Sequence, residues 1–455
     1  MSKMHNRRDA EQFEVEIESL GTGGDGVGRY KSRTVFVPFT IPGEIVRARA
    51  IDTTETVIHA EGVTLVDASA DRVLPRCPHF GIGRCGKCHW QHIDPAVQAL
   101  IKQDMLAEAL ERGGVRGAPI RPIIASPQAW GYNHHMTFSV GGHDAEPILR
   151  PVSDPAPDDA PPLDGEAEAE PAPPLMINEA LYLGFPDYHD EARLIRIEEC
   201  HILHPDLLAL YAQIDLDLSN YRRVKMQIGS DGAMMLILTA LEDSAPELLT
   251  ELRVSVNLIL PDNEPMNLIG DSHTVYEVLG HPFRVTAGSY FRPHLGQMPN
   301  LVNAVIDLLA PQPHESILDL YAGVGVFSAF IAPRADLVTL IESYPPAVTD
   351  ADVNLAQFEN VDVIEGGVDM VLSALDEPYH AAVIDPPPKG ITSEALTLLR
   401  ESGVQRAVYL ADDPVGFAKT VRQFGKAGYQ LASVQPIDLA PQTAWVDLVA
   451  LFVQG

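Results

Sequence analysis

The stretch Ile317-Leu318-Asp319-Leu320-Tyr321-Ala322-Gly323-Val324-Gly325-Val326-Phe327 decides the fold of the C-terminal part of the chain. It has the pattern of an apolar strand, a turn with two glycines and the start of a helix. Ser328 occupies the place of the third glycine in the dinucleotide fingerprint, and the acid Asp319 precedes the first glycine. This pattern suits a ligand with a cationic amino acid end and no phosphate, such as S-adenosylmethionine.

Two acids at the ends of later strands strengthen this prediction. Glu342 follows the apolar residues 337–341, where a carboxylate can accept hydrogen bonds from both ribose hydroxyls of a nucleoside. Asp385 follows the apolar residues 381–384 and begins the segment Asp385-Pro386-Pro387. The combination favours a methyltransferase-type domain, and a nucleotide-binding domain remains the alternative.

Around this stretch, from residue 281 to residue 455, apolar strands alternate with amphipathic helices. This alternation predicts a doubly wound α/β domain. We expect helices at 301–309, after Gly325 and at 416–424, and strands at 316–320, 337–341, 381–384, 407–410, 431–434 and 448–453.

The first two-thirds of the chain have other patterns. Residues 11–68 contain short alternating strands between glycine and proline turns, which predicts a small β-barrel of OB type. Residues 69–280 predict a central α+β domain, with a helix at 95–112 capped by Asp94 and strands near 136–140 and 233–238. Residues 151–175 contain eight prolines, seven acids and no Lys or Arg, so we expect a disordered acidic insert there.

Length and charge set further limits. At roughly 150 residues per domain, 455 residues predict about three domains. No apolar run approaches the ~18 residues of a membrane span, and residues 1–20 have no signal-peptide pattern, so we expect a cytoplasmic protein without membrane contact. The net charge of −31 means that any nucleic-acid site must be a local basic patch on an acidic body.

The chain has four cysteines, and three of them fall within twelve residues. A large cytoplasmic protein has little use for disulfides, so the clustering of Cys77, Cys85 and Cys88 indicates a metal or cluster site. Cys85 and Cys88 have the spacing of a ligand knuckle, and four thiolates also suit zinc. Histidines 79, 89 and 92 are more simply explained as loop residues than as ligands.

Over nearly all of its length the chain resembles the RNA uracil-5-methyltransferases, in particular the class with an N-terminal TRAM domain and a [4Fe-4S] cluster. The resemblance is carried by Val35-Phe36-Val37-Pro38, Cys77-Pro78-His79-Phe80, Cys85-Gly86-Lys87-Cys88, Gly288-Ser289-Tyr290-Phe291, the glycine stretch quoted above and Asp385-Pro386-Pro387. It implies a TRAM barrel at 11–68, a central domain with the cluster at 69–280 and a class I methyltransferase domain at 281–455.

The resemblance also implies site residues. It makes Cys77, Cys85, Cys88 and the distant Cys200 the four cluster ligands, and it favours iron and sulfur over zinc. It implies that S-adenosylmethionine is the cofactor and that rRNA or tRNA is the partner, with no obligate protein partner. The cofactor-binding positions that it implies are Arg292, Asp319, Tyr321, Gly323, Gly325, Glu342 and Asp385.

The chain departs from the family where the substrate base would meet the cofactor. The family chemistry uses a cysteine thiolate that adds to uracil C6 and so activates C5. That cysteine position is Asp412 here, and no fifth cysteine exists. The family base position is Asp447 instead of glutamate, and Arg292 stands where the family has glutamine. A carboxylate is a far weaker nucleophile than a thiolate, so the usual adduct is not expected.

Three hypotheses follow from these departures. The first is an active RNA methyltransferase that transfers to a base nitrogen or a ribose oxygen without a covalent adduct. The second is a lapsed homologue that still binds RNA and the cofactor, and the third is a scaffold or redox-sensitive module. A basic surface shared by residues 29–33, 72–87 and 222–225 would favour RNA binding.

Overall fold

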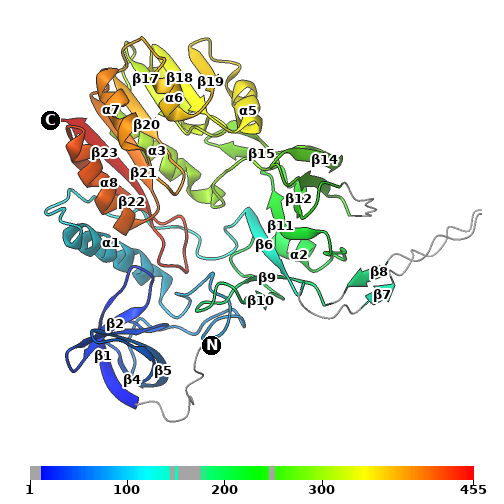
Figure 1. Ribbon diagram of the computed structural model, residues 1–455, viewed down its shortest axis with the longest axis vertical. Helices are drawn as coiled ribbons and strands as arrows, with labels where there is room; N and C mark the ends of the chain where they lie inside the picture. The colour runs from blue at the N-terminus through cyan, green and yellow to red at the C-terminus, as the bar shows by residue number, and fades with distance from the viewer. Residues whose placement is uncertain (1–11, 144–148, 152–175, 179, 245–251) are drawn as a thin grey trace, which may run out of the picture.

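The computed structural model describes residues 12–143, 149–151, 176–178, 180–244 and 252–455. Figure 1 shows a small β-barrel, a central sheet and a C-terminal sheet flanked by helices. The acidic insert expected at 151–175 lies outside the described residues except for its first residue, Pro151. Across the part of the chain that is described, no helix is long and apolar enough to cross a membrane.

The N-terminal strands close into a barrel in the order β1-β2-β3-β5-β4. Polar and apolar residues alternate along β1, and its apolar side chains lie in the barrel core with Val35 and Val46. β1 pairs with both β2 and β4, while β3 pairs with β5 in parallel and completes the closure. The small β-barrel expected here is confirmed. The strands are β1 (Gln12–Leu20), β2 (Gly26–Tyr30), β3 (Arg33–Val37), β4 (Ile45–Thr53) and β5 (Val57–Asp67).

The central domain is built on a seven-stranded sheet. Its order is β10 (Leu194–Arg196), β9 (Tyr182–Pro186), β6 (His135–Gly141), β11 (Tyr221–Ile228), β12 (Met234–Ala240), β13 (Ser255–Ile259) and β14 (Pro265–Ile269). The short helix α2 (Pro205–Tyr211) packs its Leu207 and Leu210 against Phe138 and Val224 of this sheet. A separate pair consists of β7 (Leu149–Pro151) and β8 (Met176–Asn178).

The C-terminal sheet has seven strands in the order β19-β18-β17-β20-β21-β23-β22, of which β23 runs antiparallel to its neighbours. Alternate residues of each strand point to opposite faces, and helices cover both faces. This confirms the doubly wound arrangement. Its strands are β17 (Ser316–Leu320), β18 (Leu337–Glu342), β19 (Val361–Glu365), β20 (Ala381–Ile384), β21 (Arg406–Ala411), β22 (Tyr429–Ile437) and β23 (Asp447–Gln454).

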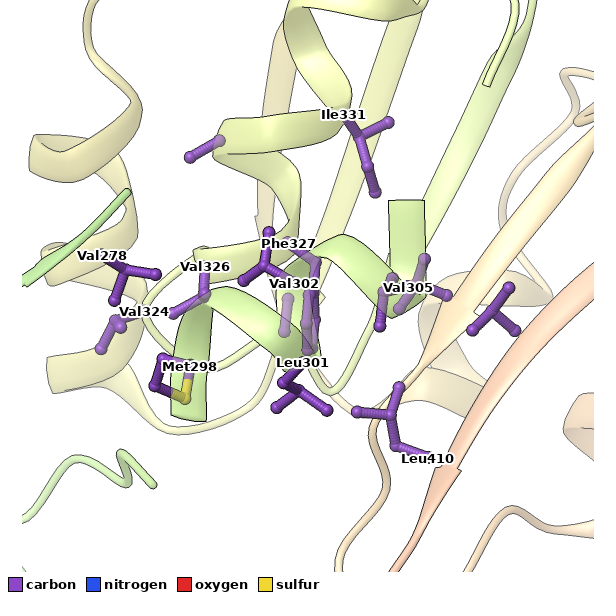
Figure 2. Packing of buried hydrophobic residues seen from close by; sticks show 14 of the residues in the cluster. Val278, Met298, Leu301, Val302, Val305, Val324, Val326, Phe327, Ile331 and Leu410 are labelled. Carbon is purple, nitrogen blue, oxygen red and sulfur yellow. The ribbon is translucent and has the colours of Figure 1, made fainter. Parts of the chain in front are cut away.

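One face of this sheet carries α3, α4 and α5, and the other carries α6, α7 and α8. In Figure 2, Leu301 and Val305 of α3 pack in one cluster with Phe327 of α4 and Leu410 of β21. Each fully buried side chain of this kind contributes roughly 1.5–3 kcal/mol. The helices are α3 (Met298–Leu309), α4 (Val326–Ile331), α5 (Pro345–Leu355), α6 (Val368–Leu372), α7 (Ser393–Glu401) and α8 (Pro414–Lys426).

Two elements outside residues 281–455 join this domain. Helix α1 (Pro95–Arg112) places Leu106 and Leu110 in the core beside α8, and Figure 1 shows it lying next to that helix. The hairpin of β15 (His273–Val278) and β16 (His281–Thr286) packs Tyr276 and Phe283 into the opposite core. The domain boundary that we predict at residue 281 therefore divides a hairpin whose two strands pack together.

Helix α1 begins as its sequence predicts. Pro95 is its first residue, and the Asp94 carboxylate accepts a hydrogen bond of 2.9 Å from the Ala96 N–H. One apolar residue of α1, Leu100, does not belong to its buried face, because it is 60% exposed. The buried face contains Gln98 and Lys102 instead, which bind polar groups of the C-terminal segment that follows β22.

Candidate functional site

The candidate site lies at the carboxyl ends of β17, β18, β20 and β21. The chain runs from β17 outward to β19 and then returns to β20 on the other side of β17, so the strand order reverses between β17 and β20. Open α/β sheets bind ligands in the crevice at such a switch point. Asp385 follows β20 and Asp412 follows β21, so the fold brings these two acids to the same edge as the glycine loop.

The glycine loop adopts the conformation that its sequence suggests. Gly323 and Gly325 have φ values of 56° and 83°, in the left-handed region that favours glycine. A Cβ atom at Gly323 would meet no atom within 4 Å, so the loop faces open space there. Tyr321 also has a positive φ, 59°, which is uncommon outside glycine. The loop is thus a shaped backbone surface with room for a ligand.

Asp319 is completely buried at the start of this loop. Its Oδ2 accepts hydrogen bonds of 3.0 Å from the Ser328 N–H and 2.7 Å from the Ser328 hydroxyl. Its Oδ1 is buried and has no hydrogen-bond partner within the described residues. Burial, with Asp385 and Glu342 nearby, raises the pKa of Asp319 to about 7. The unpaired oxygen is a free acceptor for a cationic ligand group, which fits the amino end of S-adenosylmethionine.

Glu342 closes the loop from the neighbouring strand. Its Oε2 accepts a hydrogen bond of 2.9 Å from the Gly323 N–H. Its Oε1 accepts from the backbone N–H groups of Ser343 and Tyr344, at 2.6 and 2.8 Å. The carboxylate is therefore held at the tip of β18, where it can also accept from ribose hydroxyls.

Arg292 and Asp385 form a fork-to-fork ion pair in the centre of the site. Arg292 Nη1 and Nη2 lie 2.7 and 2.9 Å from the two carboxylate oxygens of Asp385. The side chains are only 13% and 20% exposed, so little water screens the pair. His135 helps to position this loop, because its Nε2 lies 2.6 Å from the carbonyl oxygen of Phe291. Arg292 and Asp385, both predicted to be cofactor positions, therefore lie in direct contact with each other.

Asp447, the predicted base position, is the first residue of β23 and lies on the other side of Arg292. Its Oδ1 is 3.6 Å from Arg292 Nε, and its side chain is 18% exposed. Burial, with help from Asp412 and Asp385, raises the pKa of Asp447 to about 7, although the cations Arg292 and Lys102 oppose the shift. Asp412 is exposed and close enough to Asp447 to influence this ionisation. The site thus places the carboxylates of Asp385 and Asp447 beside one guanidinium, with Asp412 near Asp447.

Sequence reasoning missed three neighbours of this cluster. Tyr290 is 66% exposed and Trp445 is 51% exposed, and each stands two residues before a member of the cluster. Lys102 of α1 is fully buried and electrostatically linked to Asp447. The first two could have been found by their spacing from Arg292 and Asp447. Lys102 could not, because its sequence position matches an ordinary exposed helix residue.

The four cysteines line one cavity in the central domain, far along the chain from the methyl-transfer candidates. Cys77, Cys85 and Cys88 come from one loop and Cys200 from another, and Trp130, Phe185 and Ile202 complete the walls. All four are free thiols. Burial raises the pKa of Cys85 to about 11 and that of Cys200 to about 12, and neighbouring cysteines add to both shifts. Four thiols on one cavity are the donor chemistry of a thiolate-bound cluster, and binding of such a group would release their protons.

Two further observations concern which ligands this cavity offers. Among the described residues, no three His, Cys, Asp or Glu side chains stand together as a holder for a single metal ion. His89 and His92 do not line the cavity: His89 Nε2 accepts a 2.9 Å hydrogen bond from the Ala444 N–H, and His92 Nε2 is 3.4 Å from the Thr40 carbonyl. His79 does line it, but its Nε2 accepts a hydrogen bond from Glu198 N–H.

Some of the basic residues predicted to form an RNA surface bind other groups of the protein instead. The sequence makes Arg72 a candidate for phosphate contact, but its guanidinium binds the fully buried Glu44 carboxylate at 2.5 and 2.7 Å, so that expectation is wrong. Lys87 lies over the Phe185 ring, 5.4 Å from its centre. Arg222 and Arg223 are exposed on β11. In Figure 1 β11 lies in the central sheet, away from the barrel strand β2 that carries Arg29.

The fold and the site together define a methyltransferase fold joined to a small N-terminal barrel. A profile of the TRAM domain matches residues 8–63. The crystal structure of the Pyrococcus abyssi tRNA (uracil-54, C5)-methyltransferase with S-adenosyl-L-homocysteine has a similar fold, with a TM-score of 0.68 and 18% identity. The similarity covers 97% of this chain and 100% of that one.

Relatives along the whole length fix the family. An uncharacterized RNA methyltransferase of Streptomyces coelicolor is 30% identical over 97% of this chain and 92% of its own length. Another from Streptomyces avermitilis is 29% identical over 97% and 98%. The chain belongs to this family of RNA methyltransferases.

Proposed function

We propose that the chain transfers methyl groups from S-adenosylmethionine to rRNA or tRNA, within the lineage of the uracil-5-methyltransferases, and that it does so without a cysteine adduct. The observation that carries the proposal is the switch-point site, where a glycine loop facing open space meets Asp319 and Glu342. Family membership and the TRAM barrel support RNA as the substrate.

The chain's own residues divide the work of cofactor binding. Glu342 would accept from the ribose hydroxyls, the backbone of the glycine loop would lie against the cofactor, and Asp319 Oδ1 would accept from its amino end. Tyr321, whose own φ is 59°, adds a third residue with a left-handed backbone to this loop. When bound, S-adenosylmethionine supplies an electrophilic methyl group next to a sulfonium.

The proposal extends to the cysteine cavity. Cys77, Cys85, Cys88 and Cys200 would hold a [4Fe-4S] cluster, because iron–sulfur clusters take four thiolates and all four free thiols line one cavity. Cys200 is distant in sequence from the other three, so a cluster would tie two loops of the central domain together. Zinc bound by the same thiolates is the alternative.

The test combines transfer with binding. Anaerobically purified protein is incubated with labelled S-adenosylmethionine and RNA from cells that lack its gene, and the digested nucleosides are identified by mass spectrometry. We expect a labelled nucleoside and binding of S-adenosylhomocysteine in a calorimetric titration. Binding of cofactor and RNA without any labelled product would contradict transfer and support the lapsed homologue instead.

A further inference from the structure

We propose that Arg292 and Asp447 recognise the lactam edge of a base, the neighbouring C=O and ring N–H of guanine or uracil, and that the ring nitrogen is the methyl acceptor. In this arrangement Arg292 donates to the carbonyl oxygen and Asp447 takes the proton of the nitrogen. The inference rests on the proposed function and deepens it by naming the acceptor.

The first argument is the placement of the thiols. A carbon acceptor at uracil C5 needs a nucleophile that adds to C6, and the chain's four cysteines all line the cavity of the central domain. The site at the sheet edge has carboxylates where a thiol would have to stand. A ring nitrogen carries its own electron pair once its proton is removed, so it needs no adduct.

The second argument is an unsatisfied donor beside an acceptor. Arg292 uses both Nη atoms on Asp385, but its buried Nε has no hydrogen-bond partner within the described part of the chain. Asp447 Oδ1 lies 3.6 Å from that Nε, beyond hydrogen-bond distance. An unpaired buried donor is costly unless a ligand completes it. The pair therefore presents one donor and one acceptor side by side.

That pairing selects among bases by their edges. Guanine and uracil have a carbonyl oxygen directly beside a ring N–H, which matches a donor next to an acceptor. Adenine and cytosine have an amino group beside an unprotonated ring nitrogen, so they can meet this pair only with the ring nitrogen at Arg292 and the amino group at Asp447. In that orientation Asp447 finds no ring proton to remove. A ribose hydroxyl offers no carbonyl for Arg292. The exposed ring of Tyr290 lies near Arg292 and Asp447 and can stack on a base that leaves its helix.

The chemical step balances with these groups alone and the methyl donor. Asp447 removes the ring proton, and the electron pair of that N–H bond stays on nitrogen and forms the new N–C bond to the methyl group. The bond from the methyl carbon to the sulfonium sulfur breaks, and its electrons remain on sulfur. Arg292 stabilises the negative charge that develops on the neighbouring oxygen.

The surroundings of Asp447 suit a base that works near neutral pH. The charged and titratable groups that face it come from four elements, and they are Arg292, Asp385, Asp412, Lys102 and Tyr290. Burial and the two other carboxylates outweigh the two cations and raise the pKa of Asp447 to about 7. Such a carboxylate is a stronger base than an exposed one and is still ionised in part at pH 7.

The test identifies the product. Total RNA from cells that lack the gene is incubated with the protein and deuteromethyl S-adenosylmethionine, and the labelled nucleoside is identified after digestion. Labelled N1-methylguanosine or N3-methyluridine is expected, and the two outcomes tell guanine from uracil. Labelled 5-methyluridine, an amino-methylated base or a ribose-methylated nucleoside would overturn the inference and leave the proposed function intact. No labelled nucleoside would overturn both.

Variants of Asp447 distinguish a loss of proton removal from a loss of the folded cofactor site. Asp447→Asn should lower the transfer rate by about 100-fold or more, the scale of a lost general base, while S-adenosylhomocysteine still binds with an affinity within about twofold of wild type. Asp447→Glu should restore part of the rate. The matched control is Asp352→Asn on the exposed side of α5, which should change neither value. An Asp447→Asn enzyme with an unchanged rate would overturn the assignment of Asp447 as the base.

Discussion

Lys102 Nζ lies 2.5 Å from Asp438 Oδ1, and both side chains are almost completely buried. Lys102 also donates to the carbonyl oxygen of Ala440 at 2.9 Å. This contact fastens α1, which precedes the central sheet, to the segment between β22 and β23. Asp447 begins the second of these strands, so the ion pair supports the wall of the candidate site.

Removing one partner of this buried pair should lower the free energy of unfolding much more than removing one partner of a surface pair. We expect Lys102→Met to lower the free energy of unfolding by about 3–5 kcal/mol, because it leaves the Asp438 charge buried and unpaired. Arg47→Met is the control, since Arg47 and Glu14 are half exposed and 2.8 Å apart, and it should cost about 0–1 kcal/mol. Denaturant unfolding measures both. Equal losses would show that Lys102 and Asp438 do not act as a buried pair.

Glu342 and Glu365 offer a second matched comparison. They are register partners at the ends of β18 and β19, but only Glu342 binds the glycine loop. We expect Glu342→Ala to weaken calorimetric binding of S-adenosylmethionine by about 1.5–3 kcal/mol, the value of lost charge-assisted hydrogen bonds. Glu365→Ala should leave the affinity unchanged. Unchanged affinity in Glu342→Ala would refute its ribose role.

The ionisation of Asp447 predicts how stability depends on pH. Its folded pKa of about 7 is above its ordinary value of 3.8, so the folded state holds the proton more tightly than the unfolded state does. The contribution of this proton to the free energy of unfolding is therefore present at low pH, and it is lost as the pH rises from about 4 to about 7. Asn resembles the protonated form. We expect Asp447→Asn to be stabilising, by an amount that grows by about 1–3 kcal/mol between about pH 5 and about pH 8.

The pH experiment has a control variant and one result that would contradict it. Asp352 is exposed, so Asp352→Asn should show no such growth with pH. A stability difference between wild type and Asp447→Asn that stays flat from pH 5 to pH 8 would mean that Asp447 is ionised normally in the folded protein. In that case the carboxylate would not be matched to proton removal near neutral pH.

Much of the architecture was predictable because its signals are local. The glycine stretch at 317–327, the Asp94-Pro95 start of α1 and the alternation in β1 each fix a strand or helix through neighbouring residues. The positions of Asp385 and Glu342 at one sheet edge followed as well, since parallel strands end on the same side. These predictions needed no knowledge of distant contacts.

What the sequence could not predict depends on contacts between distant residues. The ion pair between Arg292 and Asp385 joins two loops that are far apart in the sequence, so no local pattern predicts it. Arg72 was expected at a surface, but the buried Glu44 of the barrel binds it. Lys102 has the same local pattern as an exposed helix residue, and only the fold shows that Asp438 lies opposite. The burial and the role of a charged residue thus cannot be predicted from local sequence, because both depend on a partner that is distant in the chain.

The cysteine cavity gives the last prediction. If Cys77, Cys85, Cys88 and Cys200 hold a [4Fe-4S] cluster, protein purified without oxygen should be brown, with broad visible absorption and iron and sulfide in matching amounts. Cys88→Ser should abolish the colour, because Cys88 is buried against the other three thiols and a hydroxyl is a poor ligand for iron.

His201→Asn is the control: His201 also lines the cavity, yet the colour should persist. A colourless wild-type protein that contains zinc would refute the cluster, and loss of colour in His201→Asn as well would make the histidine a fifth participant in the site.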